Sequence, residues 1–261
     1  MTSLILAIDI GNTNMEFGVY ENDKIQASFR VITNREITSD ELGLTLMQFF
    51  SFNKIDRQAI EDVIISSVVP QVMYSVNNAI KKYLDRTALV ANVNMPIGIK
   101  NCYSNPAEVG TDRLVSSYAA LKKYGGPLIV IDFGTATTFD AINAKGEYLG
   151  GAIYPGLKIS MEALFSRTAK LPRVEIADPG CVIGKNTVSS MQSGVLFGYV
   201  GAVENIVRLM KQDLGEETKV IATGGLASLF SSHASCINLV DRPIMLDGLL
   251  MIYKDYKEAQ K

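Results

Sequence analysis

Two stretches of the sequence place an acid, a glycine and hydroxyl or amide side chains directly after an apolar run. The first is Asp9-Ile-Gly-Asn-Thr13, and the second is Asp132-Phe-Gly-Thr135, with Thr137 and Thr138 following it. The glycine lets backbone amides approach a ligand, and the hydroxyl and amide groups suit phosphate oxygens. The carboxylate is a hard oxygen ligand for a metal ion. Each stretch could bind a nucleotide phosphate with a cation, and the alternative is a strand that ends in a tight turn.

The two stretches occupy corresponding positions in the two halves of the chain. Each follows an apolar run typical of a buried strand, at 4–8 and at 128–131, and each precedes a second strand of alternating character. One copy could arise by chance. Two matching copies predict a duplicated domain with a nucleotide between the halves.

Asp112 and Arg113 form a reactive pair at the start of a predicted helix. Gly110 before them gives close access, and an arginine can bind a carboxylate or a phosphate through two hydrogen bonds. The pair suits a hydroxyl-bearing anionic substrate from which Asp112 takes the hydroxyl proton, and a positioned base contributes roughly 10² to 10⁴ in rate. The alternative is that Asp112 only caps the helix.

The first half of the chain is predicted as β-β-β-α-β-α-β. A capping box at Thr38 opens the first helix, Pro70 lies in the first turn of the second, and a strand over 88–93 closes the half. The stretch over 96–110 is too poor in periodicity to be one element. This pattern predicts a mixed sheet flanked by helices.

The second half begins with a hairpin over 128–142 and continues with a strand over 146–154 and a helix. Its longest predicted helix spans 188–213, and the strand after that helix ends in Thr223-Gly-Gly225. Such a glycine turn lets a flat base or ribose lie on the backbone. A last helix is predicted over 246–256.

The longest predicted helix carries Gly194, Gly198 and Gly201 on one stripe, with Ser190 one turn earlier. Small residues at this spacing allow another helix to approach closely. That helix could belong to the same subunit or to a second copy of the chain.

The composition is typical of a folded, soluble protein. The chain has 261 residues, of which 48% are hydrophobic and 20% are charged, and its net charge is −2. No block of like charge favours a nucleic acid partner. The three cysteines are widely spaced, no secretory leader precedes the first strand, and the longest apolar stretch is interrupted by glycines. We therefore expect a cytoplasmic protein with reduced thiols and no membrane association.

In their order along the chain, the motifs resemble those of type III pantothenate kinases, of the acetate and sugar kinase, Hsp70 and actin superfamily. The resemblance spans nearly the whole chain and rests on these segments: Asp9-x-Gly-Asn-Thr13, Ser66-Ser-Val-Val-Pro70, Tyr103-x-Asn-Pro106, Gly110-x-Asp-Arg113, Asp132-x-Gly-Thr-Ala-Thr137, Gly150-Gly-Ala-Ile-x-Pro-Gly156, Gly184-Lys-Asn-Thr187, Ser190-Met-Gln-Ser-Gly194 and Thr223-Gly-Gly225.

The resemblance implies an α/β fold of two duplicated ribonuclease H-like domains, each a mixed five-stranded sheet flanked by helices, with the active-site cleft between them. Residues 1–117 would form an N-terminal actin-like ATPase-type domain with the first phosphate loop. Residues 118–261 would form the C-terminal actin-like domain, with the second phosphate loop and the adenosine-binding turn.

The implied enzyme is a phosphotransferase with an alcohol group as acceptor. It would transfer phosphate from ATP to pantothenate, giving 4'-phosphopantothenate in the first step of coenzyme A biosynthesis, with Asp112 as general base. The residues expected to hold pantothenate are Tyr103, Gly110, Thr111, Asp112, Arg113 and Thr187.

The ATP site implied by the resemblance combines both hairpins with the glycine turn. Its expected residues are Asp9, Ile10, Gly11, Asn12, Thr13, Asn14, Met15, Glu16, Gly134, Thr135, Gly224 and Gly225. Asp132 would bind a monovalent cation, potassium or ammonium. Magnesium would arrive with ATP, and Asp9 is a candidate contact for it. Glu16 departs from the family pattern, because some members carry a basic residue there, and by its charge we expect it to face solvent.

The family is usually dimeric, with the substrate pocket near the interface, so the resemblance favours a homodimer through the glycine stripe. Two other functions stay open. One is a kinase or phosphatase of the same superfamily that acts on another small hydroxyl or phosphate compound. The other is a non-enzymatic regulator, since close relatives of the family were first described as accessory factors for virulence gene transcription.

Overall fold

The computed structural model describes residues 3–92 and 95–261. These divide into two compact units, within each of which most contacts are made. The first comprises the described residues up to Ile99 together with Ser104–Ala119 and Pro243–Lys261, and the second comprises Lys100–Tyr103 and Ala120–Arg242. The boundary near residue 119 lies close to the expected division at 117. The C-terminal segment differs from that division, because it belongs to the first unit and not to a 118–261 domain.

The first unit contains a five-stranded mixed sheet in the order β3-β2-β1-β4-β5. The strands are β1 (Leu4–Ile10), β2 (Asn14–Glu21), β3 (Lys24–Ile32), β4 (Ile60–Ser67) and β5 (Ala88–Ala91). β1, β2 and β3 form an antiparallel meander, and β4 and β5 run parallel to β1. The predicted strand over 88–93 is β5, and its predicted end at Val93 lies outside the described residues.

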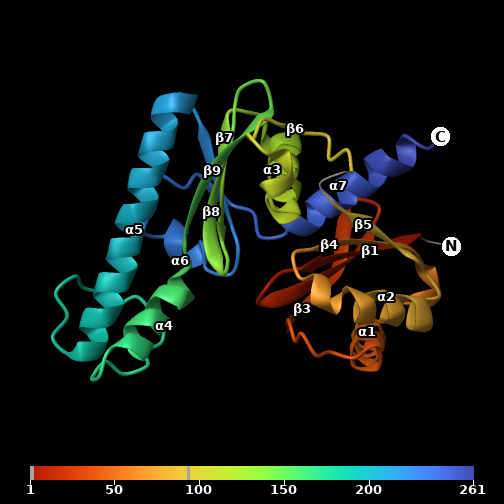
Figure 1. Cartoon of the computed structure of the whole chain (residues 1–261), viewed down its shortest axis with the longest axis horizontal. Helices are drawn as coiled ribbons and strands as arrows, with labels where there is room; N and C mark the ends of the chain where they lie inside the picture. The colour runs from red at the N-terminus through yellow and green to blue at the C-terminus, as the bar shows by residue number, and fades with distance from the viewer. Residues whose placement is uncertain (1–2, 93–94) are drawn as a thin grey trace. The chain divides into compact units, whose positions relative to one another are not determined.

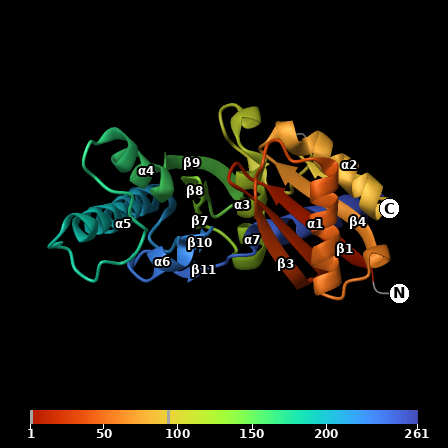
Figure 2. The same cartoon turned by 90° about the horizontal axis from the view of Figure 1, so that it is seen from below.

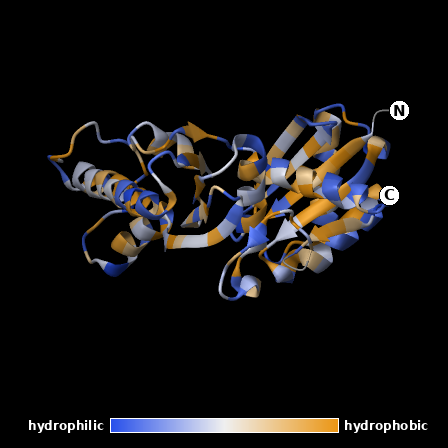
Figure 3. Cartoon of the chain, turned by 90° about the horizontal axis from the view of Figure 1, so that it is seen from above, coloured by the Kyte–Doolittle hydropathy of each residue, from blue (hydrophilic) through white to orange (hydrophobic). Residues whose placement is uncertain are grey.

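Helices α1 (Ser39–Phe52) and α2 (Met73–Leu84) cover one face of this sheet (Figure 1). The predicted capping box forms, since Thr38 accepts a hydrogen bond from the Glu41 amide and the Glu41 side chain accepts one from the Thr38 amide. Pro70 opens a short 3₁₀ turn, η2 (Pro70–Val72), directly before α2. A second such turn, η1 (Arg57–Ala59), precedes β4. Figure 3 shows the strands of this sheet mainly in the hydrophobic colour, as expected for a sheet covered on both faces.

Helix α7 (Ile244–Glu258) packs on β1, β2 and β4. The Tyr20 hydroxyl donates to Asp247 at 2.6 Å, and the Tyr253 hydroxyl donates to Asp62 at 2.6 Å. The first part of α3 (Thr111–Tyr124) crosses α7 closely, since a β-carbon at Gly248 would lie 2.7 Å from the Val115 carbonyl oxygen. The short turn η3 (Pro106–Glu108) leads into α3.

The second unit contains a six-stranded sheet in the order β11-β10-β7-β8-β9-β6. The strands are β6 (Lys100–Asn101), β7 (Leu128–Phe133), β8 (Ala136–Ile142), β9 (Glu147–Pro155), β10 (Lys219–Thr223) and β11 (Leu239–Val240). The expected count of five strands is corrected to six by β6. That strand has only two residues and comes from a stretch predicted to be irregular, so it has no periodicity to detect.

The helices of the second unit are α4 (Leu157–Arg167), α5 (Thr187–Leu214) and α6 (Ala227–Ser231). In Figure 2, α4 and α5 lie side by side. Residues of α5 and α6, including Tyr199, Val203 and Phe230, share a buried cluster with Ile129 and Ile131 of β7. In the described part of the chain, no helix combines the length and the apolar character that crossing a bilayer requires.

The two sheets repeat one topology, which confirms the predicted duplication. In each, a three-stranded antiparallel meander is followed by a strand parallel to its first member, β4 beside β1 and β10 beside β7. A further parallel strand then extends that edge, β5 in the first unit and β11 in the second. The hairpin turns β1–β2 and β7–β8 are therefore equivalent positions in the two units.

Candidate active site

The turn of the first hairpin is fastened by its own backbone and by the end of β3. The Gly11 amide donates to the Asn14 carbonyl at 3.0 Å. The Thr33 hydroxyl donates to the Gly11 carbonyl at 2.7 Å, and the Thr33 amide donates to the Thr13 carbonyl at 2.9 Å. The side chains of Asn12 and Thr13 are exposed. A fixed turn with exposed amide and hydroxyl groups suits phosphate oxygens.

Ile10 and Met15, on either side of this turn, are fully buried in the hydrophobic core. Both were expected to contribute to the ATP site. Because their side chains belong to the core, only their backbone groups can reach a ligand.

Asp9 lies at the centre of a row of residues that crosses the first sheet. It is in register with Glu16 on β2 and with Ser66 on β4, and Glu16 is in register with Arg30 on β3. Glu16 forms an ion pair with Arg30. The side chain of Glu16 is 26% exposed and that of Arg30 is 47% exposed. Glu16 therefore does not simply face solvent, because a cation from the next strand neutralises it.

The turn of the second hairpin is backed by the start of α4. Gly134 and Thr135 are exposed, and a β-carbon at Gly156 would collide with the Thr135 carbonyl oxygen. The two hydroxyls that follow the turn are engaged within the unit. The Thr137 hydroxyl hydrogen-bonds the Tyr199 hydroxyl, and the Thr138 hydroxyl donates to Asp140 at 3.1 Å. Of the threonines in this stretch, Thr135 is the one whose side chain is exposed at the turn.

Asp132 and the glycine turn after β10 come together in the second unit. Asp132 at the end of β7 is in register with Thr223 at the end of β10. Gly224 has a φ of +90°, and a β-carbon there would collide with Oδ1 of Asp132. Glycine is therefore required at 224 by both its backbone conformation and the neighbouring carboxylate. Gly225 is exposed beside it.

Asp112 lies in the first turn of α3 but does not cap it. The Gly110 carbonyl accepts hydrogen bonds from the amides of Arg113 and Leu114, so the helix begins at Thr111 and Asp112 is its second residue. The alternative role of Asp112 as the N-cap is therefore wrong. Its Oδ1 accepts from the Arg113 amide at 2.9 Å.

Burial raises the pKa of the Asp112 carboxyl, and the hydrogen bond from the Arg113 amide opposes this shift. Desolvation disfavours the charged form of an acid. A carboxylate with a raised pKa is a stronger base toward a hydroxyl proton than an ordinary aspartate, provided that it remains ionised at the working pH. Thr111 is buried, and Arg113 is half-buried beside the carboxylate.

Tyr103 lies against β9 in the second unit. A β-carbon at Gly150, whose φ is +116°, would lie 3.0 Å from two ring atoms of Tyr103, so the glycine makes room for the ring. The Tyr103 amide donates to the Asn101 side chain at 3.0 Å, which fixes the segment after β6.

Thr187 begins α5 behind a second capping box, formed by Asn186 and Ser189. Gly184 lies so close to the backbone of Ser190 that a β-carbon would collide with it. Thr187 is exposed and opens on a hollow of about 540 Å³. The hollow is lined by Leu164, Leu171, Thr187, Ser190, Met191, Gly194 and Val195. Its volume is within the usual range for small-molecule sites.

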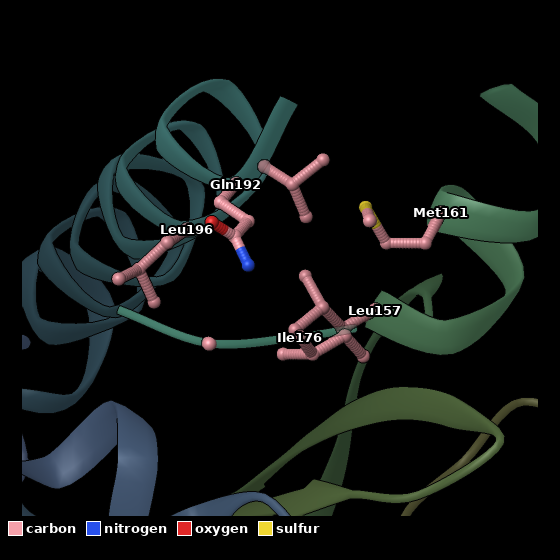
Figure 4. Close-up of a pocket in the computed structure, with 7 residues that line it drawn as sticks. Leu157, Met161, Ile176, Gln192 and Leu196 are labelled. Atoms are coloured by element: carbon pink, nitrogen blue, oxygen red, sulfur yellow. The ribbon is translucent and has the colours of Figure 1, made fainter. Parts of the chain in front are cut away.

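A small apolar gap between α4 and α5 adjoins this hollow. Figure 4 shows Leu157 and Met161 on α4, Gln192 and Leu196 on α5, and Ile176 on the segment between the two helices. Val195 lines both the gap and the hollow. Apolar side chains of the two helices thus line a gap next to the hollow on which Thr187 opens.

The expected site residues thus fall into two sets, one in each unit. The first unit holds 9–16 and 110–113, and the second holds Tyr103, Asp132, Gly134, Thr135, Thr187, Gly224 and Gly225. Within residues 3–92 and 95–261, no three His, Cys, Asp or Glu side chains cluster as a metal site. Asp9, which has Glu16 as its register partner, and Asp132 instead each lie beside an exposed turn. That arrangement fits a cation that completes its ligands with nucleotide phosphates.

Sequence reasoning did not single out Arg30, Ser66 or Tyr199 as members of the site region. Each is brought there by register or packing, Arg30 and Ser66 across the first sheet and Tyr199 onto the second hairpin. Ser66 lies in one of the motifs that resemble the family, but no role was predicted for it from that motif.

Comparison with known proteins shows both a family and a fold. Residues 5–209 match the model of the family described as Type III pantothenate kinase. A solved structure from Campylobacter jejuni, described as a Baf family transcriptional activator, is similar at 19% identity and a TM-score of 0.58, over 97% of this chain and 99% of that one.

Two further structures share the fold at lower identity. The ethanolamine utilization protein EutJ from Carboxydothermus hydrogenoformans has 13% identity and a TM-score of 0.58, over 97% of this chain and 90% of that one. Component A of the (R)-2-hydroxyglutaryl-CoA dehydratase from Acidaminococcus fermentans has 12% identity and a TM-score of 0.52, over the full length of both chains. At these identities the similarity concerns the fold alone.

Proposed function

This chain belongs to the type III pantothenate kinase family, and we propose that it transfers the γ-phosphoryl group of ATP to the primary hydroxyl of pantothenate. The family is one of phosphotransferases that act at the first step of coenzyme A biosynthesis. In the proposed reaction the hydroxyl oxygen forms a bond to the γ-phosphorus, and the bond to the bridging oxygen breaks. ADP leaves, and the hydroxyl proton passes to Asp112.

The environment of Asp112 is the observation that carries this proposal. Its carboxylate is held by the Arg113 amide and its pKa is raised by burial. The absence of a side chain at Gly110 makes room for the carboxylate, since a β-carbon there would collide with Oδ1 of Asp112. Arg113 supplies a guanidinium one residue away, which suits the carboxylate of pantothenate. A base and an anion-binding group side by side match a substrate that carries both a hydroxyl and a carboxylate.

The ATP residues of both hairpins serve the same reaction in this proposal. Asn12 and Thr13 in the first unit and Gly134 and Thr135 in the second are exposed at equivalent turns and would contact the phosphates. Gly224 and Gly225 would carry the adenosine. Most of the catalysis in phosphoryl transfer comes from positioning and charge neutralisation, which such turns supply.

Two cations are part of the proposal. Asp9 would contact magnesium, which neutralises the phosphate charge when it binds with ATP. Asp132 would hold potassium or ammonium beside the glycine turn. The proximity of the Asp132 carboxylate to Gly224 supports this assignment, because it couples the cation to the nucleotide segment.

We further propose a homodimer that forms through α5. A β-carbon at Gly194, Gly198 or Gly201 would meet no atom of the described residues within 4 Å. The stripe therefore has open space beside it in the described part of the same chain, which supports a contact with a second copy. A cytoplasmic location also stays a prediction, based on composition.

A regulator without catalysis is the second candidate function. The similar Campylobacter jejuni structure is described as a transcriptional activator, which motivates the comparison. The acids at 9, 112 and 132 are retained in this chain, and a regulator that has lost its chemistry has no need of them.

Release of ADP from magnesium ATP tests the proposal. We expect release that depends on pantothenate and that is faster in potassium or ammonium buffer than in sodium buffer. ATP binding without pantothenate-dependent release in any buffer would contradict the kinase assignment and favour the regulator. Release with another small alcohol but not with pantothenate would identify a different acceptor.

A further inference from the structure

Ser66 combines complete burial with an unpaired hydroxyl. The residue is 0% exposed, and its Oγ has no hydrogen-bond partner among the described residues. Most buried polar groups in native proteins are paired, because an unpaired one lowers the stability of the fold. The Ser66 hydroxyl is therefore available to a bound ligand.

The register of the first sheet places Ser66 beside Asp9. β1 and β4 are parallel, and Ser66 is the direct partner of Asp9 across them. Neighbouring strands lie about 4.8 Å apart, and the side chains of register partners emerge on the same face. Ile8 and Ile65, the preceding pair, belong to the core on the α1 and α2 face, so Asp9 and Ser66 lie on the opposite one.

The same pair lies at the end of the strands that carries the first hairpin turn. Ser66 is the penultimate residue of β4, and Asp9 is the penultimate residue of β1. Beyond them the Val68 amide donates to the Ile10 carbonyl at 3.1 Å, so the two chains stay side by side as far as the turn. The hydroxyl of Ser66 is thus placed where a ligand of the turn would meet the Asp9 carboxylate.

We propose that Ser66 is a positioning residue for phosphoryl transfer, whose hydroxyl hydrogen-bonds the water layer held by the Asp9 carboxylate when magnesium ATP binds at the first hairpin. The inference rests on the proposed function, because it requires a nucleotide at that turn. It gives the Ser66 hydroxyl a hydrogen-bond partner in the nucleotide-bound state, whereas it has none among the described residues of the ligand-free protein. Ser66 orients the ligands around Asp9 and exchanges no proton with the substrates.

Ser117 offers a matched control. It is also 0% exposed, and its Oγ also lacks a partner among the described residues. It lies within α3 and has no register relation to either phosphate hairpin. Replacing either serine by alanine removes an unpaired buried hydroxyl. We therefore expect both changes to shift the melting temperature of the ligand-free protein in the same direction.

The test measures the melting temperature of the ligand-free protein and the binding of magnesium ATP without pantothenate. We expect Ser66→Ala and Ser117→Ala each to melt no lower than the unmodified chain. Only Ser66→Ala should bind magnesium ATP more weakly, by about tenfold, as expected for one lost hydrogen bond in a charged site. Its half-saturating magnesium concentration at fixed ATP should rise as well.

Two further variants separate positioning from packing. Ser66→Cys nearly preserves the volume of the side chain, but a thiol is a weak hydrogen-bond donor. This variant should therefore bind magnesium ATP as weakly as Ser66→Ala does, although it leaves no cavity. In an Asp9→Asn background, Ser66→Ala should add little to the loss, because the two residues act on the same ligands. Full additivity of the two losses would mean that Ser66 does not act through Asp9 and would overturn the inference.

The outcomes separate this inference from the proposed function. Equal magnesium ATP binding by Ser66→Ala and Ser117→Ala, with intact binding in the unmodified chain, overturns the role of Ser66 and leaves the kinase assignment standing. Magnesium ATP binding without pantothenate-dependent turnover overturns the kinase assignment, while the contribution of Ser66 to magnesium ATP binding is still decided by the titrations. No magnesium ATP binding by the unmodified chain overturns both.

Discussion

The carboxylate of Asp132 occupies the space next to Gly224 that any side chain at that position would need. A β-carbon at 224 would collide with Oδ1 of Asp132, and the φ of +90° independently favours glycine. The end of β7 and the turn after β10, whose strands are paired, therefore lie in close contact. A change at 224 should disturb both the cation site and the adenosine turn proposed above.

Gly224→Ala should lower the free energy of unfolding by about 1–3 kcal/mol through backbone strain and should also abolish the effect of potassium on ATP binding. Gly215→Ala is the matched control, because Gly215 has a φ of +102° and no described atom within 4 Å of its β-carbon position. Thermal melts and ATP titrations in potassium and sodium buffers measure both effects. If potassium still affects ATP binding in Gly224→Ala, the cation at Asp132 does not act through the turn at Gly224.

Asp112→Asn should reduce turnover by about 10² to 10⁴ while ATP binding is kept, because it removes the proposed base and preserves the hydrogen bond from the Arg113 amide. A stopped or continuous ADP assay and an ATP titration on the same preparation measure the two quantities. Near-normal turnover would remove Asp112 as the base.

The same variant should be more stable than the unmodified chain at neutral pH. The pKa of Asp112 is raised in the folded state, mainly by burial. The stability linked to this group is therefore fully present below its unfolded pKa and is lost as the pH rises through its folded pKa. Asparagine has no such loss, so the difference in melting temperature should be positive at pH 7 and disappear in acid. A difference that is independent of pH would contradict the raised pKa.

The pH dependence of kcat/KM should show an acid limb above the ordinary aspartate pKa of about 3.9. In the proposed mechanism activity requires ionised Asp112, and burial raises the pKa of that carboxyl. Rates with pantothenate from weakly acidic to neutral pH measure the limb. Residual activity of Asp112→Asn should lack it, and an unchanged limb in that variant would assign the titration to another group.

Arg113→Ala should raise the pantothenate KM by about 10- to 100-fold, as expected for the loss of charge-assisted hydrogen bonds, and the ATP KM much less. Arg113→Lys keeps the charge but cannot bind a carboxylate through two parallel hydrogen bonds. Its pantothenate KM should therefore lie between that of the unmodified chain and that of Arg113→Ala. Steady-state titrations of each substrate provide the comparison. Equal effects on both substrates would argue against binding of the pantothenate carboxylate.

Gly198→Arg should convert the proposed dimer into a monomer that keeps its fold, because the described chain leaves space at that position. Light scattering after size-exclusion chromatography measures the mass, and circular dichroism measures the fold. Gln48→Arg on the exposed side of α1 is a control with the same charge change. An unmodified chain that is already monomeric would contradict the dimer.

The fold was largely predictable because its signals are local. The capping box at Thr38, the proline before α2 and the apolar runs of β1 and β7 each depend on residues a few positions apart. The two-residue strand β6 and the five-residue helix α6 escaped prediction, because elements this short contain no full period of the hydrophobic pattern.

The candidate site was predictable as a set of residue types and not as a set of contacts. Pairing of Glu16 with Arg30, and of Thr137 with Tyr199, depends on strand register and on packing of a distant helix. The hydrophobic pattern indicates which face a residue occupies, but the identity of its neighbour follows only from the assembled sheet. This is why Glu16 was expected to face solvent and was found in an ion pair.

The membership of α7 in the first unit has a consequence for synthesis of the chain. Tyr20 and Asp62 on the first strands find their partners Asp247 and Tyr253 on the last helix. The second unit from Ala120 to Arg242 is complete earlier, as a nearly continuous stretch of chain. Domains usually fold in the order in which the ribosome delivers them. The unit that begins first is therefore completed last. A chain cut short before α7 would lack the helix that packs on β1, β2 and β4, although α1 and α2 would still cover the other face of the sheet.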